Sequence, residues 1–140
     1  MNILRNTMAG ALALLALAGP GLAAAMERGQ TAAGEPYVSG GVGLDEIEAL
    51  QREKPRYNLW VRTAARGSGE YLADVQLLIA DGQGRAVFNQ PLDGPWLLIG
   101  LTPGTYTLYA SRHGAKAQPQ KVTIAPQGRR DVVFYFAPPD

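Results

Sequence analysis

The amino-acid sequence predicts a mainly β fold, a seven-stranded antiparallel β-sandwich preceded by one short helix. In residues 104–111, Tyr106, Leu108 and Ala110 alternate with more polar neighbours, as in a half-buried strand. Similar segments recur after residue 56, and turns separate them at intervals of roughly eight to twelve residues. Only one stretch, residues 44–54, has the apolar spacing of a helix.

The first 25 residues are expected to be a cleaved signal peptide. Arg5 gives a positive start, residues 8–18 form an apolar core, and residues 23–25 are small alanines that suit a signal peptidase. Gly and Pro at 19–20 interrupt the apolar run before it reaches the about 20 residues of a membrane span, so no stable membrane anchor is expected. We therefore expect a periplasmic or secreted protein.

Composition narrows the classes of function. The chain has no Cys, which excludes disulfides and a lipid-modified Cys at the processed start, so the core alone must stabilise the fold. Loss of residues 1–25 removes one basic residue, Arg5, and leaves twelve basic and twelve acidic side chains. This balance argues against a nucleic-acid partner, because nucleic-acid binders carry a marked basic excess.

The mature chain is expected to begin with a flexible leader over 26–36, which is small, polar and aperiodic. A loop and short helix follow over 37–55. Leu44, Ile47 and Leu50 share one side of this helix, and Pro55 ends it. The Gly-rich loop before the helix permits phosphate binding, but no strand clearly precedes it and the Gly-Lys-Ser/Thr signature is missing. We interpret it as a hinge.

The β-sandwich domain is expected over 56–137, with a frayed tail at 138–140. Its seven strands are predicted at 57–62, 71–80, 85–92, 96–99, 104–111, 116–124 and 131–136. Pro119 interrupts the sixth of them, so the first half of that strand is expected at an edge. The turn at 101–104 precedes Tyr106, whose hydroxyl is expected to reach back to a main-chain group upstream.

Residues 101–110 (Leu-Thr-Pro-Gly-Thr-Tyr-Thr-Leu-Tyr-Ala), after an Asp-x-x-Gly turn and short strands, resemble the carboxypeptidase regulatory-like domain. That domain is a prealbumin-like (transthyretin-like) sandwich. Further segments are similar to small exported proteobacterial proteins that carry it, namely 40–46, 57–59, 69–75 and 93–97. The resemblance implies a periplasmic or extracellular module, usually non-catalytic, and it brings no established reaction.

Catalytic and metal chemistry finds little support in the sequence. Hydroxyisourate hydrolase shares the prealbumin-like fold, but its several His residues and its Tyr-Arg-Gly-Ser ending are missing here. The single His, His113, is interpreted as a solvated turn residue, although pairing with Ser111 or Asp131 is an alternative. One His and no Cys disfavour zinc, and the turn at 81–84 lacks the later ligands of a calcium loop. No enzyme activity, metal or cofactor is expected.

The aromatic residues Trp60, Trp96 and Tyr109 form the candidate binding surface. Exposed aromatic rings on a sheet face stack on sugars or anchor a protein partner. In the alternative interpretation, Trp60 packs under the helix and Trp96 closes the end of the sandwich. The sequence therefore favours a protein-binding or scaffolding module of the cell envelope, with a carbohydrate-binding module as the alternative, and the partner is an envelope protein or glycan.

Overall fold

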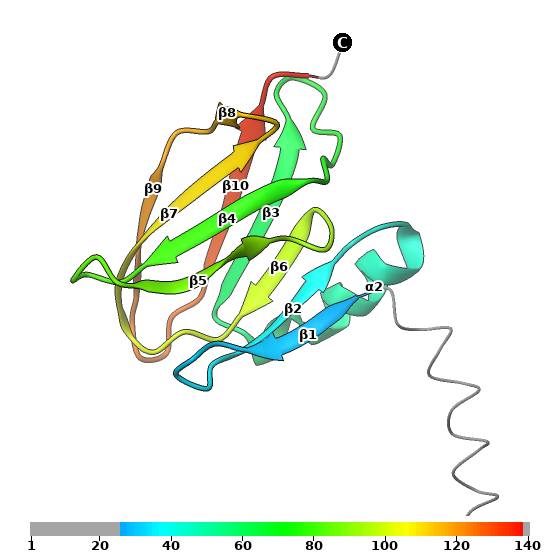
Figure 1. Ribbon diagram of the computed structural model, residues 1–140. Helices are drawn as coiled ribbons and strands as arrows, with labels where there is room; N and C mark the ends of the chain where they lie inside the picture. The colour runs from blue at the N-terminus through cyan, green and yellow to red at the C-terminus, as the bar shows by residue number, and fades with distance from the viewer. Residues whose placement is uncertain (1–25, 139–140) are drawn as a thin grey trace, which may run out of the picture.

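The computed structural model describes residues 26–138, so the expected signal peptide and the last two residues lie outside the described part (Figure 1). The fold is mainly β, as predicted, with two five-stranded sheets and one short helix. Sheet A has the strand order β1 (Glu27–Gln30), β2 (Pro36–Gly40), β6 (Trp96–Ile99), β3 (Leu59–Ala65) and β10 (Arg130–Phe136). Sheet B contains β5 (Ala86–Pro91), β4 (Val75–Ala80), β7 (Gly104–Arg112), β8 (Ala115–Lys116) and β9 (Gln120–Ile124).

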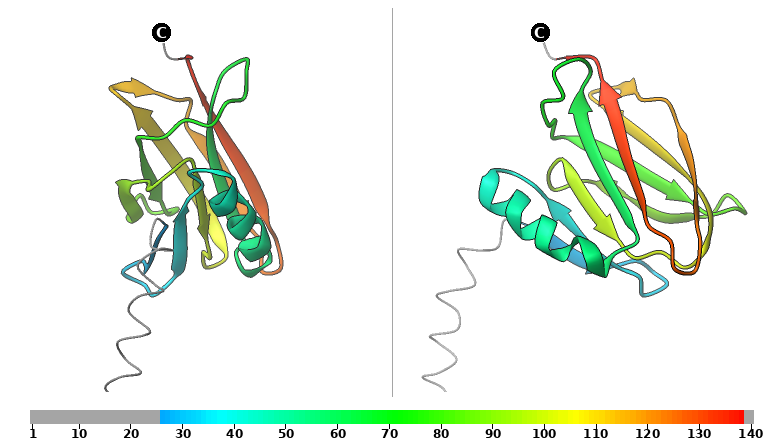
Figure 2. Two further views of the ribbon diagram at one scale, coloured as in Figure 1. Left: turned by 90° about the vertical axis from the view of Figure 1, so that its right-hand side faces the viewer. Right: turned by 180° about the vertical axis from the view of Figure 1, so that it is seen from behind.

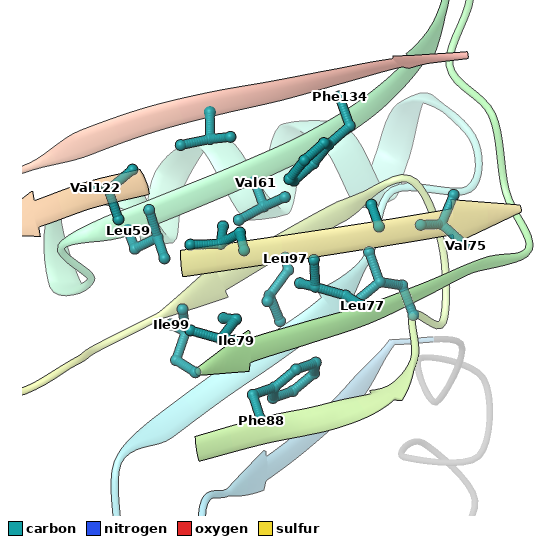
Figure 3. Close-up of a cluster of buried hydrophobic side chains, with 14 of the residues drawn as sticks. Leu59, Val61, Val75, Leu77, Ile79, Phe88, Leu97, Ile99, Val122 and Phe134 are labelled. Atoms are coloured by element: carbon teal, nitrogen blue, oxygen red, sulfur yellow. The ribbon is translucent and has the colours of Figure 1, made fainter. Parts of the chain in front are cut away.

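The main core lies between the two sheets (Figure 3). Alternate residues of each strand point inward, as the period of two dictates. Sheet A contributes, among others, Leu59, Leu97 and Phe134, and these pack with side chains such as Leu77 and Leu108 of sheet B. All five are almost fully buried. Because there is no Cys, the burial of this apolar surface is the main stabilising contribution.

The helix α2 (Leu44–Glu53) lies on the outer side of sheet A, as the two views in Figure 2 show. It continues into a single 3₁₀ turn, η2 (Lys54–Arg56), which includes Pro55. Leu50 of the predicted apolar stripe is fully buried. It belongs to a second apolar cluster, between the helix and sheet A, that consists of Val38, Leu50, Trp96 and Leu98. Ile47 packs against this second cluster. Leu44, the third member of the stripe, is exposed. The helix thus covers part of one sheet face.

The structure contains ten strands in the described residues, so the predicted number of seven is wrong. The predicted strand at 116–124 is split into β8 and β9 around Pro119, which has no amide hydrogen to donate to the ladder. Two more strands, β1 and β2, precede the helix. The expected flexible leader at 26–36 therefore includes an ordered strand, which pairs with β2 along its whole length.

The description of the fold as antiparallel is also wrong for one pair of strands. The last strand, β10, runs parallel to β3, and the register joins Arg130 with Leu59 and Phe136 with Ala65. All other strand pairs are antiparallel. The sequence shows that residues 131–136 are apolar on both sides, but this pattern does not determine which neighbour the strand takes.

The predicted Tyr106 corner is present. The Tyr106 hydroxyl donates a hydrogen bond to the main-chain oxygen of Thr102 at 2.5 Å, while the ring is buried in the main core. Burial raises the pKa of the Tyr106 phenol above 10.0, and the negative charges of Glu35 and Asp81 raise it further. The corner therefore requires the protonated phenol.

Replacement of Tyr106 by Phe is expected to lower the free energy of unfolding by about 1 kcal/mol, the net contribution of one such hydrogen bond. Because the folded-state pKa is raised, the stabilisation is complete below pH 10 and is lost as the pH rises through the folded-state pKa. Urea unfolding of both proteins between pH 7 and strongly alkaline pH checks this. A difference that stays constant across pH 10 and above contradicts it.

Candidate functional site

The structure separates the three aromatic residues that the sequence grouped together. Trp96, on β6, retains only 2% of its surface and packs in the second cluster with Val38 and Leu50. Its ring stacks edge-on against Tyr71, with 6.0 Å between the ring centroids. The Trp96 Nε1 is buried and has no hydrogen-bond partner among the described residues. Trp96 is thus a packing residue rather than a platform for a ligand.

Trp60, on β3, is half-buried beneath the end of the helix. Its Nε1 donates to the main-chain oxygens of Lys54 and Tyr57, at 3.1 and 3.2 Å. The Lys54 Nζ lies 4.2 Å from the centre of the Trp60 ring, within the range of a cation–π contact. The ring and its polar group are therefore already used by the 3₁₀ turn, which agrees with the packing interpretation of this residue.

Tyr109, on β7, is the member of the set that is available to a ligand. It retains 44% of its surface and points away from the core on the outer face of sheet B. Across the sheet it is opposite Leu78 of β4, which is in turn opposite Asn89 of β5. Two residues further along each strand, and so on the same face, Gln76 is opposite Ser111. These registers gather an aromatic ring, two amides and a hydroxyl on one face.

Two hollows flank Tyr109. The first, of about 440 Å³, lies over β4, β5 and β7 beside the segment around Pro119, and it has Leu78 and Ala117 among its apolar walls. The second, of about 390 Å³, extends toward the β4–β5 turn and is lined by Thr105, Thr107, Lys121 and neighbouring turn residues. Tyr109 lines both, so its exposed ring lies between two neighbouring hollows on the outer face of sheet B. We name this surface the Tyr109 trough.

The polar groups of the trough are partly held in place. The Gln76 Nε2 donates to the Asn89 Oδ1 at 3.2 Å. Each amide has a second polar group, and that group has no hydrogen bond to another described residue. The pair therefore presents one donor and one acceptor to a ligand in the first hollow.

The charges of the trough are mainly positive. Lys116 lines the first hollow and Lys121 the second, and neither has a carboxylate within salt-bridge distance in the described part of the chain. The one acidic residue that lines either hollow is Asp81, in the second, and it forms a salt bridge of 3.2 Å with Arg85. Hydrogen bonds from the amides of Arg85 and Gln83 lower the pKa of Asp81 and keep it charged.

The other sequence candidates do not form a site. His113 is exposed at a turn and lies 3.7 Å from Asp74, and no hydrogen bond joins it to Ser111 or Asp131 in the described residues. The amides of Gly41 and Val42, in the Gly-rich loop, both donate to the Glu46 Oε1 at 3.0 Å, so a carboxylate occupies the position of a phosphate. Within residues 26–138, no three acidic, His or Cys side chains are grouped to hold a metal ion.

Sequence reasoning identified Tyr109 and missed its neighbours. The alternation in β7 already placed Thr105, Thr107 and Tyr109 on the same face. Gln76, Asn89 and the two lysines come from other strands, and only the register between strands brings them next to Tyr109. Such register is set by turn geometry and packing, and a single sequence gives no direct signal for it.

Comparisons with known proteins do not assign the chain to a family. No protein-family model matches it, and no curated protein gives a significant match. Among the helices of the described residues, none combines the length and the apolar character that are needed to cross a lipid bilayer.

Proposed function

We propose that this protein is a non-catalytic binding module of the cell envelope, and that its recognition surface is the Tyr109 trough. The observation that carries the proposal is the exposed Tyr109 ring at the junction of two hollows. Ligand sites of this kind combine apolar walls with a few polar groups that fix orientation. Export, through cleavage near residue 25, and a prealbumin-like type of fold are parts of the same proposal. The Tyr106 corner supports the fold type.

Of the two ligand classes that the sequence leaves open, the trough favours carbohydrate over a protein partner. An extended peptide typically binds by adding a strand at a sheet edge, where main-chain groups are free. The trough lies on the face of sheet B, where Tyr109, Thr107 and Ser111 offer side-chain groups only. An aromatic ring with amides and hydroxyls around it matches the apolar faces and hydroxyl groups of sugar rings.

Replacement of Tyr109 by Ala is expected to reduce binding to an envelope fraction by about tenfold or more, because it removes the central contact of the surface. Purified protein is immobilised and tested against periplasmic protein and against envelope polysaccharide by interferometry. Tyr135→Ala is the matched control, because Tyr135 is 48% exposed on a strand of the opposite sheet. Binding that both variants lose equally, or that neither loses, contradicts the proposal.

A further inference from the structure

We propose that the Tyr109 trough binds an acidic polysaccharide, a chain of sugar rings that carry carboxylate groups. This inference rests on the proposed function and adds the chemical class of the ligand. It follows from three features of the trough: its length, the placement of its lysines and the nature of its floor.

The length of the trough suits a chain rather than a single small molecule. Lys121 is paired in register with Thr107, and Lys116 is paired with Ser111. These two positions on β7 are four residues apart, and a strand rises about 3.3 Å per residue, so they are separated by roughly 13 Å. Tyr109 lies midway between them. A short run of linked sugar rings spans this distance, with one ring on Tyr109 and others in the hollows on either side.

The lysines select for negative charge at both ends of that run. Each hollow has one lysine among its lining residues, and neither lysine has a carboxylate partner among the described residues, whereas Asp81 already has Arg85. An ammonium group binds a carboxylate through charge-assisted hydrogen bonds, which are stronger than neutral ones. The pair therefore discriminates a sugar acid from a neutral sugar, and its effect must weaken as salt is added.

The floor of the trough separates a sugar acid from a plain polyanion. Leu78 and Ala117 are apolar and partly buried, and the Tyr109 ring stands between the hollows. The amides of Gln76 and Asn89 add a donor and an acceptor beside this floor. A polyanion without sugar rings offers no C–H face to the Tyr109 ring, while a sugar ring supplies both this face and hydroxyls for the amides.

The test uses three carboxylate polysaccharides of different linkage: polygalacturonate, alginate and hyaluronate. The fully methyl-esterified form of polygalacturonate provides the same backbone without charge, and polyglutamate provides charge without sugar rings. We expect at least one of the acidic polysaccharides to bind the full mature protein. We also expect the ester and polyglutamate to bind at least about tenfold more weakly, with affinity that falls as salt rises.

Two variants and two matched controls locate the binding. Tyr109→Ala, and the double variant Lys116→Ala with Lys121→Ala, are each expected to weaken binding about tenfold. Tyr135→Ala, and Arg66→Ala combined with Arg130→Ala, remove an exposed ring or two positive charges elsewhere on the exposed surface, and we expect a change below about twofold. Circular dichroism confirms that each variant is folded.

The outcomes separate this inference from the proposed function. Equal binding of the methyl ester overturns the requirement for an acid, and equal binding of polyglutamate overturns the requirement for a sugar. If no acidic polysaccharide binds but an envelope fraction still binds in a Tyr109-dependent manner, the inference fails and the proposed function stands. If no binding of any kind depends on Tyr109, both fail.

Discussion

Replacement of Phe134 by Ala is expected to lower the free energy of unfolding by about 3–5 kcal/mol, the usual effect of truncating a buried aromatic ring. Phe134 is the largest of the fully buried side chains. It lies on β10 in register with Thr63 of β3 and fills the core between the sheets (Figure 3). Its truncation leaves a cavity that neighbouring strands cannot close, because their positions are fixed by ladder hydrogen bonds.

Urea unfolding followed by tryptophan fluorescence measures this loss. Tyr135→Ala is the control, because Tyr135 follows Phe134 on the same strand but points outward and is half-exposed. We expect the free energy of unfolding of this variant to change by less than about 1 kcal/mol. Equal losses for the two variants would show that the strand contributes through its backbone alone, and would contradict the packing described for the core.

Replacement of Gly94 by Ala is expected to lower the free energy of unfolding by about 3 kcal/mol or more, the upper range for overpacking. A Cβ at this position would lie 2.6 Å from the carbonyl carbon of Gly40 and even closer to its oxygen. Both are backbone atoms of β2, so no rotation of a side chain relieves the clash. The hydroxyl of Ser39 also accepts the amide hydrogen of Asp93 at 2.7 Å, which holds the loop against β2.

Gly82→Ala is the matched control for this prediction. The nearest atom to a Cβ at Gly82 is the main-chain oxygen of Thr105, at an ordinary contact distance of 3.6 Å. For Gly82→Ala we expect the free energy of unfolding to change by no more than about 1 kcal/mol, because the substitution acts only on the conformational entropy of the unfolded chain. Thermal unfolding of the two variants side by side gives the comparison. A Gly94→Ala protein as stable as the control would mean that the loop and β2 separate freely.

The parts of the fold that follow from local pattern were predictable from the sequence. The alternation in 104–111 predicted β7, and the turn before Tyr106 predicted the hydrogen bond to Thr102. The helix was predicted from the spacing of Leu44, Ile47 and Leu50 and from Pro55, although Leu44 is exposed and the structure continues the helix into η2. In each case the residues that determine the structure are close in sequence, so periodicity and turn chemistry are sufficient.

Other features depend on contacts between distant segments and have no local signal. Strand β1 has the polar sequence Glu-Arg-Gly-Gln, yet it pairs fully with β2. A bidentate salt bridge also joins Arg28 to Glu53 of the helix, 25 residues further along the chain, and it lowers the pKa of Glu53. The burial of Trp96 has the same origin, because the helix that covers it is placed by the whole of sheet A. Of the three residues predicted for the binding surface, Trp60, Trp96 and Tyr109, only Tyr109 therefore lies exposed on a sheet face.

The parallel pairing of β10 with β3 has a consequence for how the chain folds. These strands are adjacent in space, while about half of the polypeptide lies between them in sequence. During synthesis, a chain that has not yet supplied residues 130–136 has an open edge on β3 and lacks Phe134 between its layers. Closing so long a loop is slow, since chain entropy must be lost before the contacts form. Acquisition of the native state is therefore expected to await the final strand.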